Sequence, residues 1–64
     1  MFIKVTTPRG EILSVNFKNV LYFYEYKGGT RLVFIDESTI QIDEKAEVLE
    51  KTLYNVYSFS EVRN

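Results

Sequence analysis

The sequence predicts an α+β fold: a small antiparallel β-sheet of four to five strands, with one α-helix near the C-terminal side packed on one face. Apolar and polar side chains alternate in short runs between residues 2 and 42, which is the period of a β-strand. Turn-forming residues separate these runs, and apolar residues at helical spacing follow them. The 64 residues are expected to form a single domain, 1–64, with a tail at 57–64 that is flexible or exchanged with another copy.

Two short strands are expected at the start of the chain, Phe2 to Thr7 and Glu11 to Phe17. The residues between them, Pro8-Arg9-Gly10, are typical of a three-residue hairpin loop. Pro fixes φ at the first loop position, and Gly can take a positive φ at the last. These strands are therefore predicted to pair as a hairpin.

A second hairpin is predicted from Val20 to Ile35, around a two-residue turn at Gly28-Gly29. Side chains alternate along a strand and pair across the turn, so both faces of this hairpin are apolar. One face is expected to hold the pairs Tyr26/Arg31, Tyr24/Val33 and Tyr22/Ile35, and the other Glu25/Leu32 and Phe23/Phe34.

Thr39 to Ile42 is too short for a helix and is predicted to be a strand. Pairing about a turn at Glu37-Ser38 would place Ile40 opposite Ile35 and Ile42 opposite Val33. Both isoleucines would then join the face that carries the tyrosines.

A helix is expected after Asp43, a good N-cap, since Glu44 and Glu47 place negative charge near the positive end of the helix dipole. Its apolar stripe repeats at helical spacing: Ala46, Leu49, Leu53 and Val56. We expect this stripe to pack against the face that carries Tyr22 and Tyr24.

Asn55 is a residue at which the helix can end, because Asn tolerates positive φ. The tail beyond it would then be a last strand, an arm onto a neighbouring chain, or a frayed end. These three alternatives remain open.

The composition argues against an enzyme. The chain has no His and no Cys, so the usual general base near neutral pH and the thiolate nucleophile are both missing, and its serines lack a base to activate them. Its carboxylate clusters, Asp36-Glu37 and Asp43-Glu44-Glu47, do not have the spacing of a cation-binding loop. No metal and no cofactor are expected.

Charge and hydropathy exclude further classes of protein. The net charge is −1, and the eight basic residues are scattered, which argues against nucleic acid as a partner. No run approaches the length of a membrane span, and the first residues do not resemble a secretion signal. We expect an unprocessed cytoplasmic protein that does not contact a membrane.

The best candidate for an interface is the hairpin face formed by Leu21, Phe23, Leu32 and Phe34, because soluble monomers seldom leave so many large apolar side chains bare. Three alternatives remain open for it: partial covering with self-association, complete burial beneath the first two strands, or a site for another partner or a ligand. Tyr26 and Arg31, with Glu25 nearby in sequence, are candidates for contact with a ligand or partner, since an aromatic ring beside a cation can stack planar groups.

A series of short motifs runs through residues 1–53: Ile3-Lys4-Val5-Thr6, Gly10, Asn16, Val20, Glu25, Thr30-Arg31-Leu32-Val33-Phe34, Ile40, Glu44 and Glu47-Val48. In this order the chain resembles the small FlbD-type proteins of bacterial flagellar operons. The resemblance implies a small regulatory or adaptor protein and assigns no functional residue. The segment from Val20 to Leu53 is similar, more loosely, to the core of LytTR-type DNA-binding domains, but it lacks their basic surface.

Taken together, these features predict a non-catalytic regulatory adaptor, bacterial or phage-borne, that binds another protein and forms a homo-oligomer. Self-association is expected because apolar burial, at about 25 cal/mol/Å², and ordering entropy, at about 1.5 kcal/mol per residue, nearly cancel in so short a chain. Two alternatives remain open: a protein that sequesters a small ligand in an inter-subunit pocket, and a LytTR-like nucleic-acid-binding module.

Overall fold

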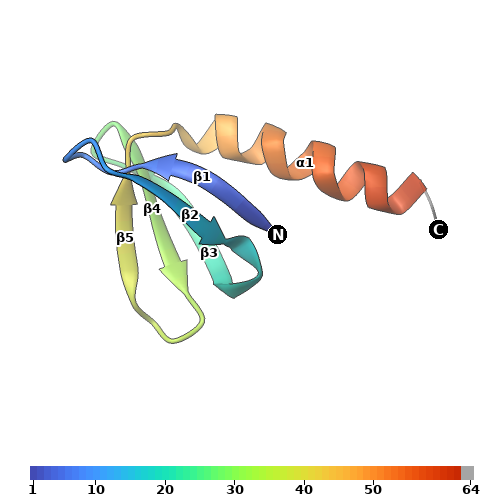
Figure 1. Ribbon diagram of the computed structural model, residues 1–64, viewed down its shortest axis with the longest axis horizontal. Coiled ribbons are helices and arrows are strands. Elements are labelled where there is room, and N and C mark those ends of the chain that lie inside the picture. Colours follow the sequence, from blue (N-terminus) through green and yellow to red (C-terminus); the bar gives the residue numbers. More distant parts are fainter. Residues whose placement is uncertain (63–64) are drawn as a thin grey trace.

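The computed structural model describes the backbone of residues 1–62 and the side chains of residues 1–55. Its elements follow one another as β1 (Phe2–Thr6), β2 (Ile12–Asn16), the 3-10 turn η1 (Phe17–Asn19), β3 (Val20–Tyr26), β4 (Gly29–Phe34), β5 (Thr39–Ile42) and α1 (Ala46–Val62). The strands form two antiparallel sheets, β1-β2 and β3-β4-β5, and the helix follows them (Figure 1). The α+β class is confirmed.

The core lies between the two sheets and under the start of the helix. Its buried residues come from both sheets, from η1 and from α1: Val5, Val15, Phe17, Leu32, Ile42 and Leu49. The sheets are joined where β5 ends, because the Asp43 amide donates to the Thr6 carbonyl at 2.8 Å. The Thr6 amide in turn donates to both carboxylate oxygens of Glu44, at 2.9 and 3.0 Å. Residues of both sheets, among them Val5, Leu32 and Ile42, are buried together behind this closure.

The first hairpin forms as predicted. Ile3 pairs with Val15 and Val5 with Leu13; Ile3, Val5 and Val15 lie in or against the core, whereas Leu13 is 36% exposed. Gly10 has φ of +88°, the conformation expected of Gly at the last loop position.

The turn of the second hairpin lies one residue earlier than the predicted Gly28-Gly29. Lys27 and Gly28 are the central residues, with φ of 50° and 80°, as in a type I′ turn. Gly29 is the first residue of β4 and pairs with Tyr26. Each cross-strand partner therefore moves by two residues, so that Tyr24 faces Arg31 rather than Val33. A shift of two keeps every side chain on its predicted face.

A bulge at the start of β3 overturns the predicted position of Leu21. Val20 pairs with Phe34 and Tyr22 with Val33, so Leu21 is the extra residue. Val20 instead packs against the core, and Leu21 is 62% exposed.

The predicted pairing of β5 is wrong, and this changes which face is covered. The loop is Ile35-Asp36-Glu37 rather than a turn at Glu37-Ser38, since the Phe34 amide donates to the Ser38 carbonyl at 2.8 Å. Ile40 therefore pairs with Leu32 instead of Ile35, a shift of three residues. An odd shift turns every side chain of the strand over, and Ile40 and Ile42 lie on the inner face.

The helix also differs from expectation in its bounds and its packing. It begins at Ala46, after Asp43 has bonded to β1, and it passes through Asn55 to end at Val62. The predicted tail is thus helical to residue 62, and residues 63 and 64 lie outside the described part. Leu49 is buried as predicted, but in the core between the sheets and not on the face of Tyr22 and Tyr24. Because the stripe follows Ile42 inward, the tyrosines stay uncovered.

Candidate functional site

The outer face of the β3-β4-β5 sheet carries a row of tyrosines with a cation beside it. Alternation along β3 places Tyr22, Tyr24 and Tyr26 on this face, and their partners in β4 are Val33, Arg31 and Gly29. Gln41 lies opposite Arg31 in β5 and completes the face. We call Tyr22, Tyr24, Tyr26, Arg31 and Gln41 the tyrosine face. Tyr22 is 54% exposed and Tyr24 41%.

The three rings are in contact along the strand. Tyr22 and Tyr24 stack with centroids 6.2 Å apart and an interplanar angle of 28°. Tyr24 and Tyr26 meet edge to face at 6.1 Å and 79°. Such pairs hold aromatic side chains in place on a sheet surface. The rings therefore present an ordered apolar strip with hydroxyl groups attached.

Two cations surround the ring at one end of this strip. The Arg31 guanidinium carbon is 3.9 Å from the centroid of Tyr26, and the Lys27 ammonium nitrogen is 5.4 Å from it. Both distances are within the range of a cation–π contact. Among the β3, β4 and β5 residues on this face, Arg31 is the charged one and none is acidic. Arg31 and Lys27 therefore bring two positive charges to this end of the face, where Asp43 follows β5 beside Gly29.

Gln41 ties β5 to the far strand. Its Nε2 donates to the Tyr26 carbonyl at 2.9 Å, a bond that spans β4 where Gly29 has no side chain. Its Oε1 is buried and has no hydrogen-bond partner among the described residues. The hydrogen bond from Gln41 Nε2 to the Tyr26 carbonyl therefore ties the end of the face that carries Tyr26 and Arg31 to β5.

The four apolar interface candidates do not form one exposed surface. Leu32 has no exposed surface, and Phe23 and Phe34 are half-buried against the core. Leu21 is exposed at the bulge, apart from them. This face is therefore covered in part: Leu32 is enclosed, whereas Phe23 and Phe34 keep some exposed surface.

Two of the three candidates for contact with a ligand or partner lie together, and the third lies on the other face of the sheet. Tyr26 and Arg31 lie together on the tyrosine face, whereas Glu25 pairs with Thr30 on the opposite face of β3 and β4. The expectation that the helix covers Tyr22 and Tyr24 is wrong, for the reason given by the β5 register. The sequence does hold a signal for that register. Asp36 lies three residues before Thr39 and can form a turn with Ser38.

Two of the carboxylates, Asp36 and Glu44, serve local structure. Asp36 Oδ1 accepts hydrogen bonds from the Ser38 hydroxyl at 2.6 Å and the Ser38 amide at 3.0 Å. These bonds, the side-chain one first, lower the pKa of Asp36 below its usual value. Glu44 is held by Thr6, and within the described part of the chain no group of three acidic, His or Cys residues is arranged to hold a metal ion. Nor does that part contain a helix with the length and hydropathy of a membrane span.

No protein-family model, curated protein or solved structure matches this chain.

Proposed function

We propose that this protein is a non-catalytic regulatory adaptor that binds another protein through the tyrosine face. The observation that carries the proposal is the contiguous strip of Tyr22, Tyr24 and Tyr26, ordered by ring contacts and left open beside Arg31. Tyr and Arg are the side chains most enriched at the centres of protein interfaces. Tyr offers a large contact area for little loss of conformational freedom.

The shape and charge of the face favour a protein over the alternatives. Small-ligand sites are concave pockets that enclose most of the ligand, whereas Tyr22 and Tyr24 are 54% and 41% exposed on this face of the sheet. Single-stranded nucleic acid stacks on aromatic rings but also needs a track of cations along its phosphates. Here the cations gather at Tyr26 alone, and the chain carries a net charge of −1. A partner with apolar groups for Tyr22 and Tyr24 and an anionic group for Arg31 fits these features.

Quantitative affinity capture tests this proposal with matched variants. Wild type is compared with Tyr22→Ser/Tyr24→Ser, which removes the strip, and with Phe2→Ser/Ile12→Ser. The control pair removes two apolar side chains that are more exposed than the tyrosines, 70% and 71%, from the other sheet. Each captured protein is then purified and its binding to the three forms is measured by calorimetry.

The proposal requires a protein that wild type and the control bind and that the tyrosine variant binds at least about tenfold more weakly, a loss of about 1.4 kcal/mol. Equal binding by all three forms would overturn it. Capture that disappears on nuclease treatment would assign the face to nucleic acid instead.

A further inference from the structure

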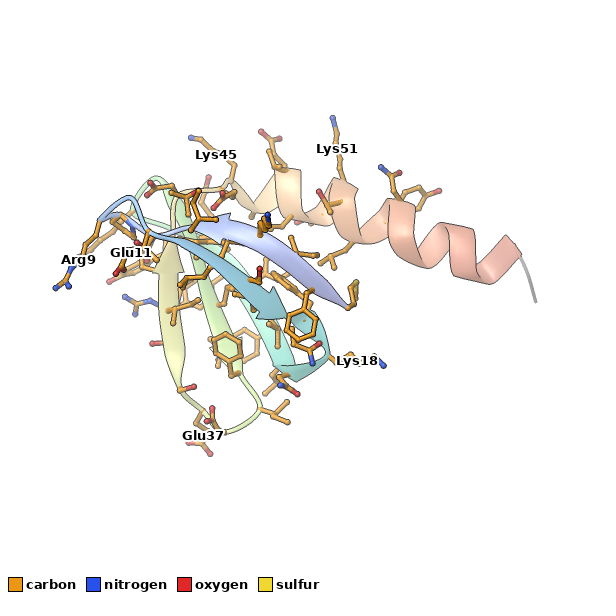
Figure 2. All side chains as sticks on the ribbon, in the orientation of Figure 1. Arg9, Glu11, Lys18, Glu37, Lys45 and Lys51 are labelled. Carbon is orange, nitrogen blue, oxygen red and sulfur yellow. The ribbon has the colours of Figure 1, made fainter. Side chains whose placement is uncertain are left out.

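The outer side of the helix carries acidic side chains, which the strands of the tyrosine face lack. A shallow hollow there is lined by Glu47, Glu50, Lys51, Tyr54 and Asn55, which we call the outer helix face. Tyr54 is 70% exposed, and both glutamates are exposed. Lys51 points away from the sheets (Figure 2), so this side of α1 is not used in the fold. The face carries two carboxylates and one ammonium group, and is therefore net negative.

These two surfaces are complementary in charge and in kind. Arg31 and Lys27 supply two cations without a strand carboxylate on their face, and Glu47 and Glu50 supply two anions. Each surface also has exposed aromatic area, Tyr22 and Tyr24 on one and Tyr54 on the other. Carboxylates bind a guanidinium more strongly where aromatic rings exclude water from the contact.

The two surfaces of a single molecule cannot contact each other. The helix starts from the end of β5 and packs through Leu49 on the inner side of the β3-β4-β5 sheet, whereas the tyrosine face is the outer side of that sheet. The two surfaces therefore point away from each other, and their complementarity is available only between molecules.

We propose that the tyrosine face of one copy binds the outer helix face of a second copy, with Arg31 and Lys27 opposite Glu47 and Glu50. This inference rests on the proposed function, because it takes the tyrosine face to be a protein-binding surface and names an occupant. The two surfaces differ, so the contact is head-to-tail and leaves one of each kind free on every pair. Repetition gives a closed ring or a filament.

An isologous contact between two tyrosine faces is disfavoured by the same charges. It would bring two sets of Arg31 and Lys27 onto one interface with no strand carboxylate between them. Like charges in an interface cost free energy and suppress that pairing.

Sedimentation velocity with charge-reversed variants tests the inference. Arg31→Glu disables the tyrosine face, and Glu47→Lys/Glu50→Lys disables the outer helix face. Lys4→Glu on the outer side of β1 and Glu25→Lys/Glu37→Lys are controls that make the same changes of charge at exposed residues outside both surfaces. Urea unfolding of each variant verifies that it is folded before its mass is measured.

Wild type and both controls should associate to masses above that of a dimer as concentration rises, and each disabled variant should associate at least about tenfold more weakly. Mixing Arg31→Glu with Glu47→Lys/Glu50→Lys should restore association in a mixed complex, because each retains the surface that the other has lost. The complex should weaken with salt.

A wild type that stays monomeric, disabled variants that associate like wild type, or a mixture that stays monomeric would each overturn head-to-tail self-association. A monomeric wild type whose binding to another purified protein still depends on Tyr22 and Tyr24 would leave the proposed function in place. Failure of the inference and failure of the proposed function are thus separable.

Discussion

The Arg31 guanidinium lies over the ring of Tyr26, 3.9 Å from its centroid, and the two residues come from different strands of the outer sheet face. The backbone at Tyr26 is also tied to β5, since Gln41 Nε2 donates to the Tyr26 carbonyl. A cation placed in this way is pre-oriented, and little side-chain freedom is left to lose when it binds a carboxylate. We therefore expect the end of the tyrosine face that carries Arg31 to select a partner with a carboxylate at the matching position.

Adjacent residues of β3 should separate folding from binding. Phe23→Ala removes a ring packed against the core, and we expect it to lower the free energy of unfolding by about 2 to 4 kcal/mol. Tyr24→Ala removes a ring on the open face and should cost about 1 kcal/mol or less. Urea denaturation monitored by circular dichroism measures both. Equal losses of stability would mean that Phe23 is packed no more closely than Tyr24, which would contradict the assignment of an inner and an outer face.

These faces could be predicted from the sequence only in part. Alternation along Val20 to Tyr26 predicts which side chains share a face, and moving the turn to Lys27-Gly28 preserved that result because partners shift by two residues. The partner of Ile40 shifted by three, because Asp36 and Ser38 stabilise a three-residue loop. That one local preference decides whether the helix and β5 cover the tyrosines or leave them open. The length of this loop depends on a few hydrogen bonds, each of which contributes little to the free energy of folding. The periodicity of apolar residues therefore does not reveal it.

Leu49 should be the residue on which stability depends most among the described side chains of the helix. Its side chain is 2% exposed and lies in the core that residues of both sheets form, so Leu49→Ala should lower the free energy of unfolding by about 2 to 5 kcal/mol. Val48→Ala is the control, because Val48 is 50% exposed, and it should change stability by about 0.5 kcal/mol. The urea midpoints of the two variants give the comparison. A larger effect at Val48 would mean that the helix packs with a different side inward.

The two glycines of the second turn should respond to alanine for different reasons. A Cβ at Gly29 would collide with the backbone carbonyl of Ile42, so Gly29→Ala should cost about 2 kcal/mol or more. Gly28 has open space around it but φ of +80°, and Gly28→Ala should cost about 1 kcal/mol. Thermal unfolding ranks the two variants. A greater loss at Gly28 would place Gly29 in the turn after all.

The Asp36 loop should make a small contribution to stability that depends on pH. Hydrogen bonds from Ser38 lower the pKa of Asp36 in the folded state below its unfolded value. The contribution is therefore present above the unfolded pKa and is lost as the pH falls through the folded pKa. NMR titration of the Asp36 carboxyl carbon should show a pKa below that of an unstructured Asp, and Ser38→Ala should raise it. A pKa that does not move in Ser38→Ala would mean that Ser38 is not the cause.

The most direct test of the central claim, that the tyrosine face is the working surface, is site-specific photo-crosslinking. A benzophenone side chain replaces Tyr24 in one variant and Ser14, exposed on the outer side of the other sheet, in its control. Irradiation followed by mass spectrometry identifies what each position touches. We predict protein adducts at position 24, including peptides that contain residues 47–55 of a second copy, and none above background at position 14. Adducts at position 14 with none at position 24 would contradict the account.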